Sequence, residues 1–113
     1  MRAIVMHQRG GPEVLTFEPD FLEPAVGPDD VLVQVRACGL NRVDMFTRAG
    51  EQGVRPPLPH ILGMEVAGDV AAVGENVRGV QVGQRVLVPP STPCGACEWC
   101  RRGAANICPN QQV

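Results

Sequence analysis

Aromatic side chains are scarce in this 113-residue sequence. Three phenylalanines and one tryptophan make up 4% of it, and tyrosine is absent. The core must therefore be built mostly from valine, leucine, isoleucine and alanine, and the many valines favour strands. Thirteen glycines and eleven prolines are spread along the chain, which predicts frequent turns between short elements.

Long apolar stretches and long runs of one charge are also missing. No apolar stretch approaches the roughly 20 residues that cross a bilayer, and the N-terminus lacks the apolar core of a signal peptide. Ten basic and twelve acidic side chains give a net charge of -2, without a basic run that would follow nucleic acid. We therefore expect one cytoplasmic domain with neither a membrane segment nor a nucleic-acid partner.

Short β-like segments follow one another along most of the chain. The pattern predicts strands over residues 2–6, 14–18, 30–38, 65–73 and 84–88, a helix over residues 41–49 that ends at Gly50, and an exposed loop over residues 51–59. In the third strand, alternation places Val31, Val33, Val35 and Ala37 on one apolar face. Closely spaced glycines from Gly63 to Gly83 indicate strands that bend around a small barrel.

The most specific feature is a group of four closely spaced cysteines near the end of the sequence. They are Cys94, Cys97, Cys100 and Cys108. Two residues between thiols allow a tight turn to direct both sulfurs to one point, and zinc favours four such ligands in a tetrahedron. Because four thiolates close the coordination shell, this zinc would be structural. Arg101 and Arg102 would offset the negative charge of the thiolates.

Two other chemistries use four cysteines. Disulfides are disfavoured because the cytosol keeps thiols reduced. An iron-sulfur cluster is suggested by Pro109 after the last cysteine, but the final spacing in the ferredoxin motif is three residues, whereas here it is seven. Zinc is the preferred interpretation.

Several short motifs occur in a fixed order. They are residues 1–6 (MRAIVM), 11–15 (GPEVL), 31–35 (VLVQV), 39–44 (GLNRVD), 59–68 (PHILGMEVAG), 73–74 (VG), 82–86 (VGQRV) and the cysteine segment. Together they resemble the N-terminal GroES-like domain of medium-chain dehydrogenases and reductases. The resemblance implies a mainly β fold: a GroES-like, partly open β-barrel with a cysteine-rich zinc-binding loop lobe. It makes residues 1–113 an incomplete domain of this kind, with the zinc lobe at residues 92–110.

The resemblance also shows where this sequence departs from zinc alcohol dehydrogenases. Those enzymes carry Gly-x-Cys-x-Thr/Ser-Asp and Gly-His-Glu, in which the cysteine and the histidine bind a catalytic zinc. Here Asn41 stands at the cysteine position and Met64 at the histidine position, and Val43 replaces the hydroxyl that relays a proton. An amide and a thioether are poor substitutes for these ligands. We therefore expect no catalytic zinc, as in the quinone-oxidoreductase branch.

The activity that the resemblance implies is hydride transfer between NAD(H) or NADP(H) and a small quinone, enone or alcohol/carbonyl substrate. The candidate catalytic residues are Asn41, Asp44 and Glu65. Asn41 would donate to the developing oxyanion or position the substrate, although it could equally cap the following helix. Asp44 and Glu65 are either pocket residues or partners of nearby arginines.

Two further residues have ordinary structural interpretations. Cys38 lies outside the ligand position and is expected to pack in the core. His60 follows a proline in a loop and is expected to be exposed.

A nucleotide-binding motif is absent, because no G-x-G-x-x-G occurs in the sequence. We therefore expect that the cofactor domain is missing, that the chain is a fragment without activity of its own, and that the full-length enzyme is a homo-oligomer. The alternatives are a fragment of a zinc-dependent alcohol dehydrogenase, a non-catalytic zinc-bound structural or interaction module, and a small iron-sulfur carrier.

Overall fold

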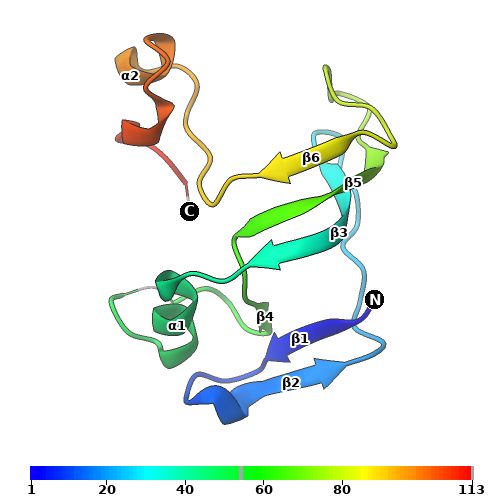
Figure 1. Ribbon diagram of the computed structural model, residues 1–113, viewed down its shortest axis with the longest axis vertical. Coiled ribbons are helices and arrows are strands. Elements are labelled where there is room, and N and C mark those ends of the chain that lie inside the picture. Colours follow the sequence, from blue (N-terminus) through cyan, green and yellow to red (C-terminus); the bar gives the residue numbers. More distant parts are fainter. Residues whose placement is uncertain (54, 113) are drawn as a thin grey trace.

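Two small antiparallel sheets form the body of the domain. The structure is a computed structural model that describes residues 1–53 and 55–112. In this part of the chain, the strand order of the first sheet is β2 (Leu15–Glu18), β1 (Ala3–Met6), β4 (His60–Ile61), and that of the second is β3 (Val31–Gly39), β5 (Glu65–Val73), β6 (Arg85–Val88) (Figure 1). The mainly β fold with a separate four-cysteine lobe, which the sequence predicts, is confirmed.

The first sheet begins as a hairpin. β1 (Ala3–Met6) pairs antiparallel with β2 (Leu15–Glu18), and the 3-10 helix η1 (Pro12–Val14) lies between them. β4 (His60–Ile61) pairs with the other edge of β1. The strand predicted from residue 14 starts one residue later, because Val14 ends the 3-10 helix.

The second sheet is built on two nine-residue strands, β3 (Val31–Gly39) and β5 (Glu65–Val73), and is completed by β6 (Arg85–Val88). A bulge in β3 places Val35 opposite Gly68 and Ala37 opposite Ala67. Since neighbouring residues of β5 point to opposite faces, Val35 and Ala37 also do so. The prediction of one continuous apolar face through Ala37 is therefore wrong.

The predicted helix is α1 (Arg42–Ala49), which follows the N-cap residue Asn41. It ends at Gly50, whose φ of 75° is the left-handed conformation typical of a glycine C-cap. The loop predicted over residues 51–59 is followed by β4, and Val54 lies outside the described residues.

The four-cysteine lobe lies apart from both sheets (Figure 1). It contains α2 (Glu98–Arg101) and the 3-10 helix η2 (Ala105–Ile107), neither of which the sequence pattern predicted. At its base, the backbones of Thr92 and Gln112 exchange two hydrogen bonds, of 2.8 and 2.9 Å. These bonds bring the two ends of the lobe together.

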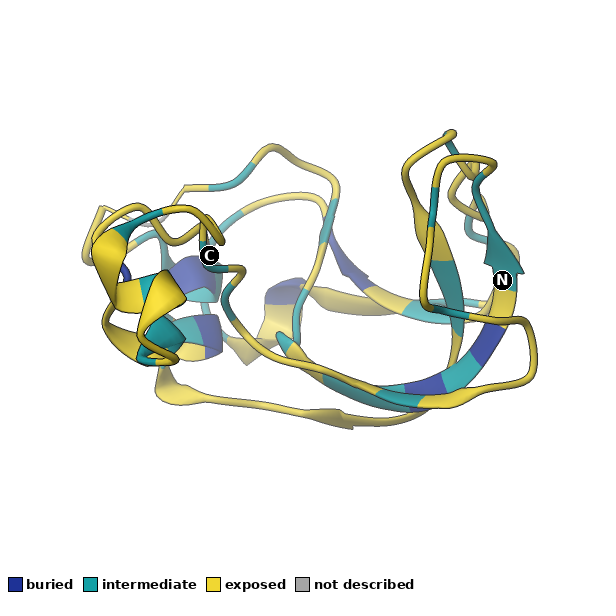
Figure 2. Ribbon diagram, turned by 90° about the horizontal axis from the view of Figure 1, so that it is seen from above, coloured by how far each residue is buried: buried dark blue, intermediate teal, exposed yellow. Residues whose placement is uncertain are grey.

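Few side chains of the described residues are fully enclosed, as Figure 2 shows. Val5 and Met6 are 0% exposed and Val70 is 2% exposed, whereas Leu22 and Leu87 are 84% and 83% exposed. The domain thus combines a small core with much open apolar surface. No helix in the described residues has the length and apolar character needed to cross a membrane.

Gly68 tests the pairing of β3 with β5. A Cβ at this buried position would lie 2.4 Å from the Gln34 carbonyl oxygen and 2.5 Å from Val33 Cγ1. Because the strand backbone cannot easily move away, Gly68→Ala is expected to lower the free energy of unfolding by about 1–3 kcal/mol. Denaturant titration measures this change.

Ala71 supplies the control, because it is exposed on the same strand. Ala71→Val should change the unfolding free energy by no more than about 0.5 kcal/mol. An unchanged unfolding midpoint for Gly68→Ala would contradict the close approach of the two strands.

Candidate functional site

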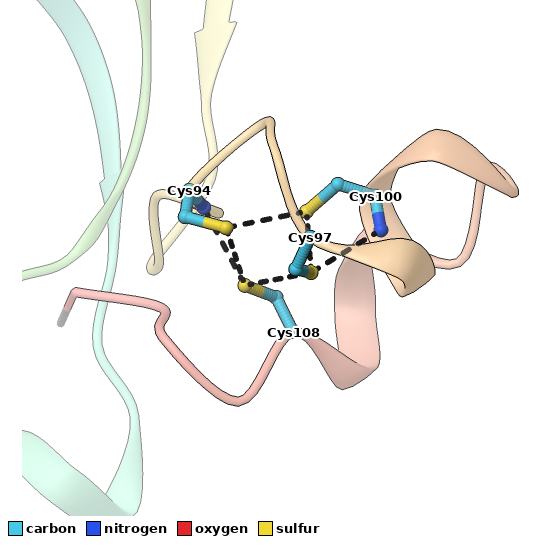
Figure 3. Close-up of side chains that lie close together, drawn as sticks. All are labelled: Cys94, Cys97, Cys100 and Cys108. Atoms are coloured by element: carbon cyan, nitrogen blue, oxygen red, sulfur yellow. Dashed lines mark hydrogen bonds between the residues drawn. The ribbon is translucent and has the colours of Figure 1, made fainter.

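The sulfur atoms of the four cysteines point toward one another (Figure 3). The distance is 3.5 Å for Cys97–Cys100 and for Cys94–Cys108, 3.8 Å for Cys97–Cys108 and 4.0 Å for Cys94–Cys100. Four sulfurs at about 2.3 Å from one zinc ion form a tetrahedron with edges of about 3.8 Å. The spacing of the sulfurs therefore fits one tetrahedral ion.

Backbone N–H groups support this arrangement. The Cys100 N–H donates to the sulfur of Cys97, the N-cap residue of α2, at 3.5 Å, and the Cys94 N–H donates to the Cys108 sulfur at 3.4 Å. Such donors stabilise negative charge on sulfur.

Whether the two arginines offset the charge of the thiolates stays a prediction. Arg102 forms an ion pair with Glu98 at 2.9 Å, and both side chains are exposed. No hydrogen bond from Arg101 or Arg102 to a sulfur is found among the described residues. Among the described residues, the sulfurs thus hydrogen-bond to backbone N–H groups and to one another.

The thiols differ in acidity when no metal is bound. Hydrogen bonds from the backbone of Ala96 and Cys97 lower the pKa of Cys94 to about 6. Partial burial, followed by hydrogen bonds with the thiols of Cys97 and Cys108, raises the pKa of Cys100 to about 12. A metal ion bound by all four thiolates would therefore displace a proton from Cys100.

The sulfur spacing also bears on the alternative chemistries. Bonded sulfurs lie about 2.05 Å apart, whereas the closest pairs here are 3.5 Å apart and all five cysteines are free. A four-iron cluster binds each thiolate to a different iron, so its core would hold the thiolates further apart. A single tetrahedral ion fits the geometry better than either alternative.

A second group of candidate residues lies where α1 begins. Asp44 is 5% exposed, and its two carboxylate oxygens accept from the N–H groups of Asn41 at 2.7 Å and Gly63 at 2.8 Å. Its partners are thus backbone groups, so the alternative of a pair with a neighbouring arginine is wrong for Asp44. Asn41 itself is exposed at the helix N-cap.

Glu65 reaches the same region through the sheet. As the first residue of β5 it pairs with Gly39, the last residue of β3, and a Cβ at Gly39 would lie 3.2 Å from Glu65 Oε2. The exposed Glu65 side chain makes no ion pair within the described residues. The sheet therefore brings Glu65 near the strand that leads to Asn41.

Glu65 also lines an open groove of about 490 Å³. The other lining residues are small or apolar: Ala37, Gly39, Val66, Ala67, Leu87, Val88, Pro89 and Pro90. The lining is thus apolar apart from Glu65. Sequence reasoning missed the groove, because its residues meet only through strand pairing and their side chains carry no chemistry of their own.

Two expectations for neighbouring residues are wrong. His60 is half-buried in β4, and burial lowers its pKa, while the charge of Asp44 opposes this shift and that of Arg9 adds to it. Cys38 is exposed and does not belong to the core. Its sulfur lies against Gly63, where an added Cβ would come within 2.3 Å of it.

Comparisons with known proteins agree with this geometry. The family described as alcohol dehydrogenase GroES-like domain matches residues 27–113. The quinone oxidoreductase of Lama guanicoe is 40% identical over 99 residues, which are 88% of this chain and 30% of that protein. The chain thus spans less than a third of the length of this curated relative.

Solved structures of alcohol dehydrogenases are equally similar. An NAD-dependent alcohol dehydrogenase is 44% identical with a TM-score of 0.81, and the match covers 100% of this chain and 33% of that chain. A cobalt- and zinc-bound thermostable alcohol dehydrogenase from Pyrobaculum aerophilum is 36% identical with a TM-score of 0.82, and the match covers 97% of this chain and 32% of that chain. The chain therefore belongs to the family of alcohol dehydrogenase GroES-like domains.

Proposed function

We propose that this chain is the substrate-side domain of an NAD(P)-dependent oxidoreductase that transfers hydride to a quinone or an enone. In this proposal Cys94, Cys97, Cys100 and Cys108 hold a structural zinc, and no catalytic zinc is used. The supporting observation is that Glu65 lines the apolar groove at the paired ends of β3 and β5, and that Asn41 follows the end of β3 by two residues.

The side chains at the ligand positions disfavour a catalytic zinc. The amide of Asn41 and the thioether of Met64 occupy the positions that thiolate and imidazole hold in zinc alcohol dehydrogenases. Both oxygens of Asp44 already accept from backbone N–H groups. Without a Lewis acid, hydrogen bonds must stabilise the oxygen that becomes negative during hydride transfer.

The zinc proposed for the cysteine lobe would be structural because of its ligands. Four thiolates leave no open position for water or substrate. The ligands come from α2, from the residue that follows η2 and from the loop before α2. Zinc would therefore connect two very short helices that make few other contacts, and so keep the lobe folded.

The chemistry of the groove can be assigned residue by residue. When bound by the rest of the protein, the nicotinamide cofactor supplies the hydride. The apolar lining would hold the substrate and exclude water. The Asn41 amide would donate a hydrogen bond to the substrate carbonyl oxygen. Glu65, the titratable side chain of the lining, would supply the proton that completes the reduction after hydride transfer.

A zinc-dependent alcohol dehydrogenase is the second candidate function. The similarity to the zinc-bound enzyme of Pyrobaculum aerophilum favours it, because that match covers 97% of the chain. Asn41 and Met64 favour the quinone or enone reductase instead. Homo-oligomerisation and a cytoplasmic location stay predictions.

Metal analysis tests the cysteine centre. The purified protein is expected to hold one zinc per chain and to be colourless, and Cys108→Ser should lower the zinc content to well below one and lower the melting temperature. Cys38→Ser is the matched control, since Cys38 lies outside the cluster, and it should keep one zinc. Visible absorption with bound iron would show that the centre is not a zinc site.

Steady-state kinetics of the full-length protein test the role of Asn41. With NADPH and a small quinone, Asn41→Ala is expected to lower kcat about 100-fold, the effect of removing one oxyanion donor. Asn76→Ala, in the turn after β5 and outside the groove lining, should keep the kcat of the unaltered protein. A kcat for Asn41→Ala within twofold of that of the unaltered protein would show that Asn41 has no catalytic role.

A further inference from the structure

We infer that Asp44 is a positioning residue, which holds the segment before α1 and the segment before β5 in a fixed relation and does not touch the substrate. This inference rests on the proposed function. It assigns Asp44 a different task from Asn41 and Glu65, with which the sequence pattern groups it.

The carboxylate of Asp44 is buried and already has a backbone partner on each oxygen. The side chain is 5% exposed, and each oxygen accepts a short hydrogen bond from a backbone N–H, 2.7 Å from Asn41 and 2.8 Å from Gly63. Bonds from N–H groups to a charged acceptor are stronger than neutral ones. Because the side chain is enclosed, a substrate has little access to the acid.

The two bonds join segments that are far apart in the sequence. Asn41 opens α1, whereas Gly63 directly precedes Met64 and Glu65. The backbones of Gly39 and Glu65 pair only two residues away from Asn41 and Gly63, respectively. Asp44 therefore extends this pairing beyond the end of the sheet and fixes how the chain leaves β3 and enters β5.

The two hydrogen bonds of Asp44 form a bridge between Asn41 and Gly63. The backbone conformation of Gly63 has little freedom to change. Gly63 has a φ of 108°, which side chains rarely tolerate, and the Cys38 sulfur occupies the place of a Cβ. The N–H of Gly63 is thus directed by the backbone toward Asp44 Oδ1. Small displacements of catalytic groups lower rates strongly, so loss of this bridge should act on the reaction rate.

The test uses Asp44→Asn in the full-length protein, with NADPH and a small quinone. Asparagine has a single oxygen acceptor, so at least one of the two N–H groups loses its partner. The expected result is a 10- to 100-fold lower kcat, with unchanged zinc content and an unchanged KM for NADPH. Hydrogen exchange at the Gly63 amide should become at least tenfold faster. Asp44→Glu keeps the charge but displaces it, and should show the same loss of kcat.

Thr47→Val is the control, because Thr47 is also 5% exposed and lies on the same helix. It should leave kcat unchanged. Equal losses of kcat in the Asp44 and Thr47 variants would mean that Asp44 only stabilises the fold, and would overturn the inference. So would a normal kcat for Asp44→Asn with fast exchange at Gly63.

A different result would contradict the proposed function itself. If the unaltered full-length protein oxidises NADPH with neither quinones nor enones, the proposed function falls, and the inference falls with it. That result comes from the unaltered protein alone, before any variant is compared.

Discussion

The antiparallel pairing of β3 with β5 is the constraint on which the candidate site depends. It places Gly39 opposite Glu65 and, through the bulge after Val35, turns Ala37 onto the same face as Ala67. The groove exists because small residues meet on this face. Asp44 continues the same connection beyond the sheet with two hydrogen bonds to backbone N–H groups. One register thus brings together the groove residues of β3 and β5, Glu65 among them.

The cysteine lobe and the groove are different sites that share a stretch of chain. Pro89 and Pro90 line the groove, and Cys94 follows four residues later. The lobe is joined at its base by the hydrogen bonds between Thr92 and Gln112. A zinc ion in the lobe would therefore help to hold the end of the groove wall without contacting the substrate. The open apolar surface elsewhere fits a domain that spans about a third of its relatives' length.

Local patterns were sufficient to predict much of this structure. Alternation and turn residues located the strands, Gly50 marked the end of α1, and the cysteine spacing anticipated the cluster. Features that depend on contacts between distant segments were not predictable. A bulge in β3 reversed the face of Ala37, and the bridge from Asp44 to Gly63 depends on a backbone N–H, which has no signature in the sequence. Cys38 was misjudged because its sheet face is open.

We propose that the protein uses zinc only to hold the lobe together. Zinc X-ray absorption spectroscopy of the full-length protein tests it most directly, because the spectrum reports the ligands of every zinc ion present. We expect one zinc per chain with four sulfur neighbours at about 2.3 Å and no lighter ligand. A second zinc per chain, or nitrogen and oxygen neighbours at about 2.0–2.2 Å, would contradict it.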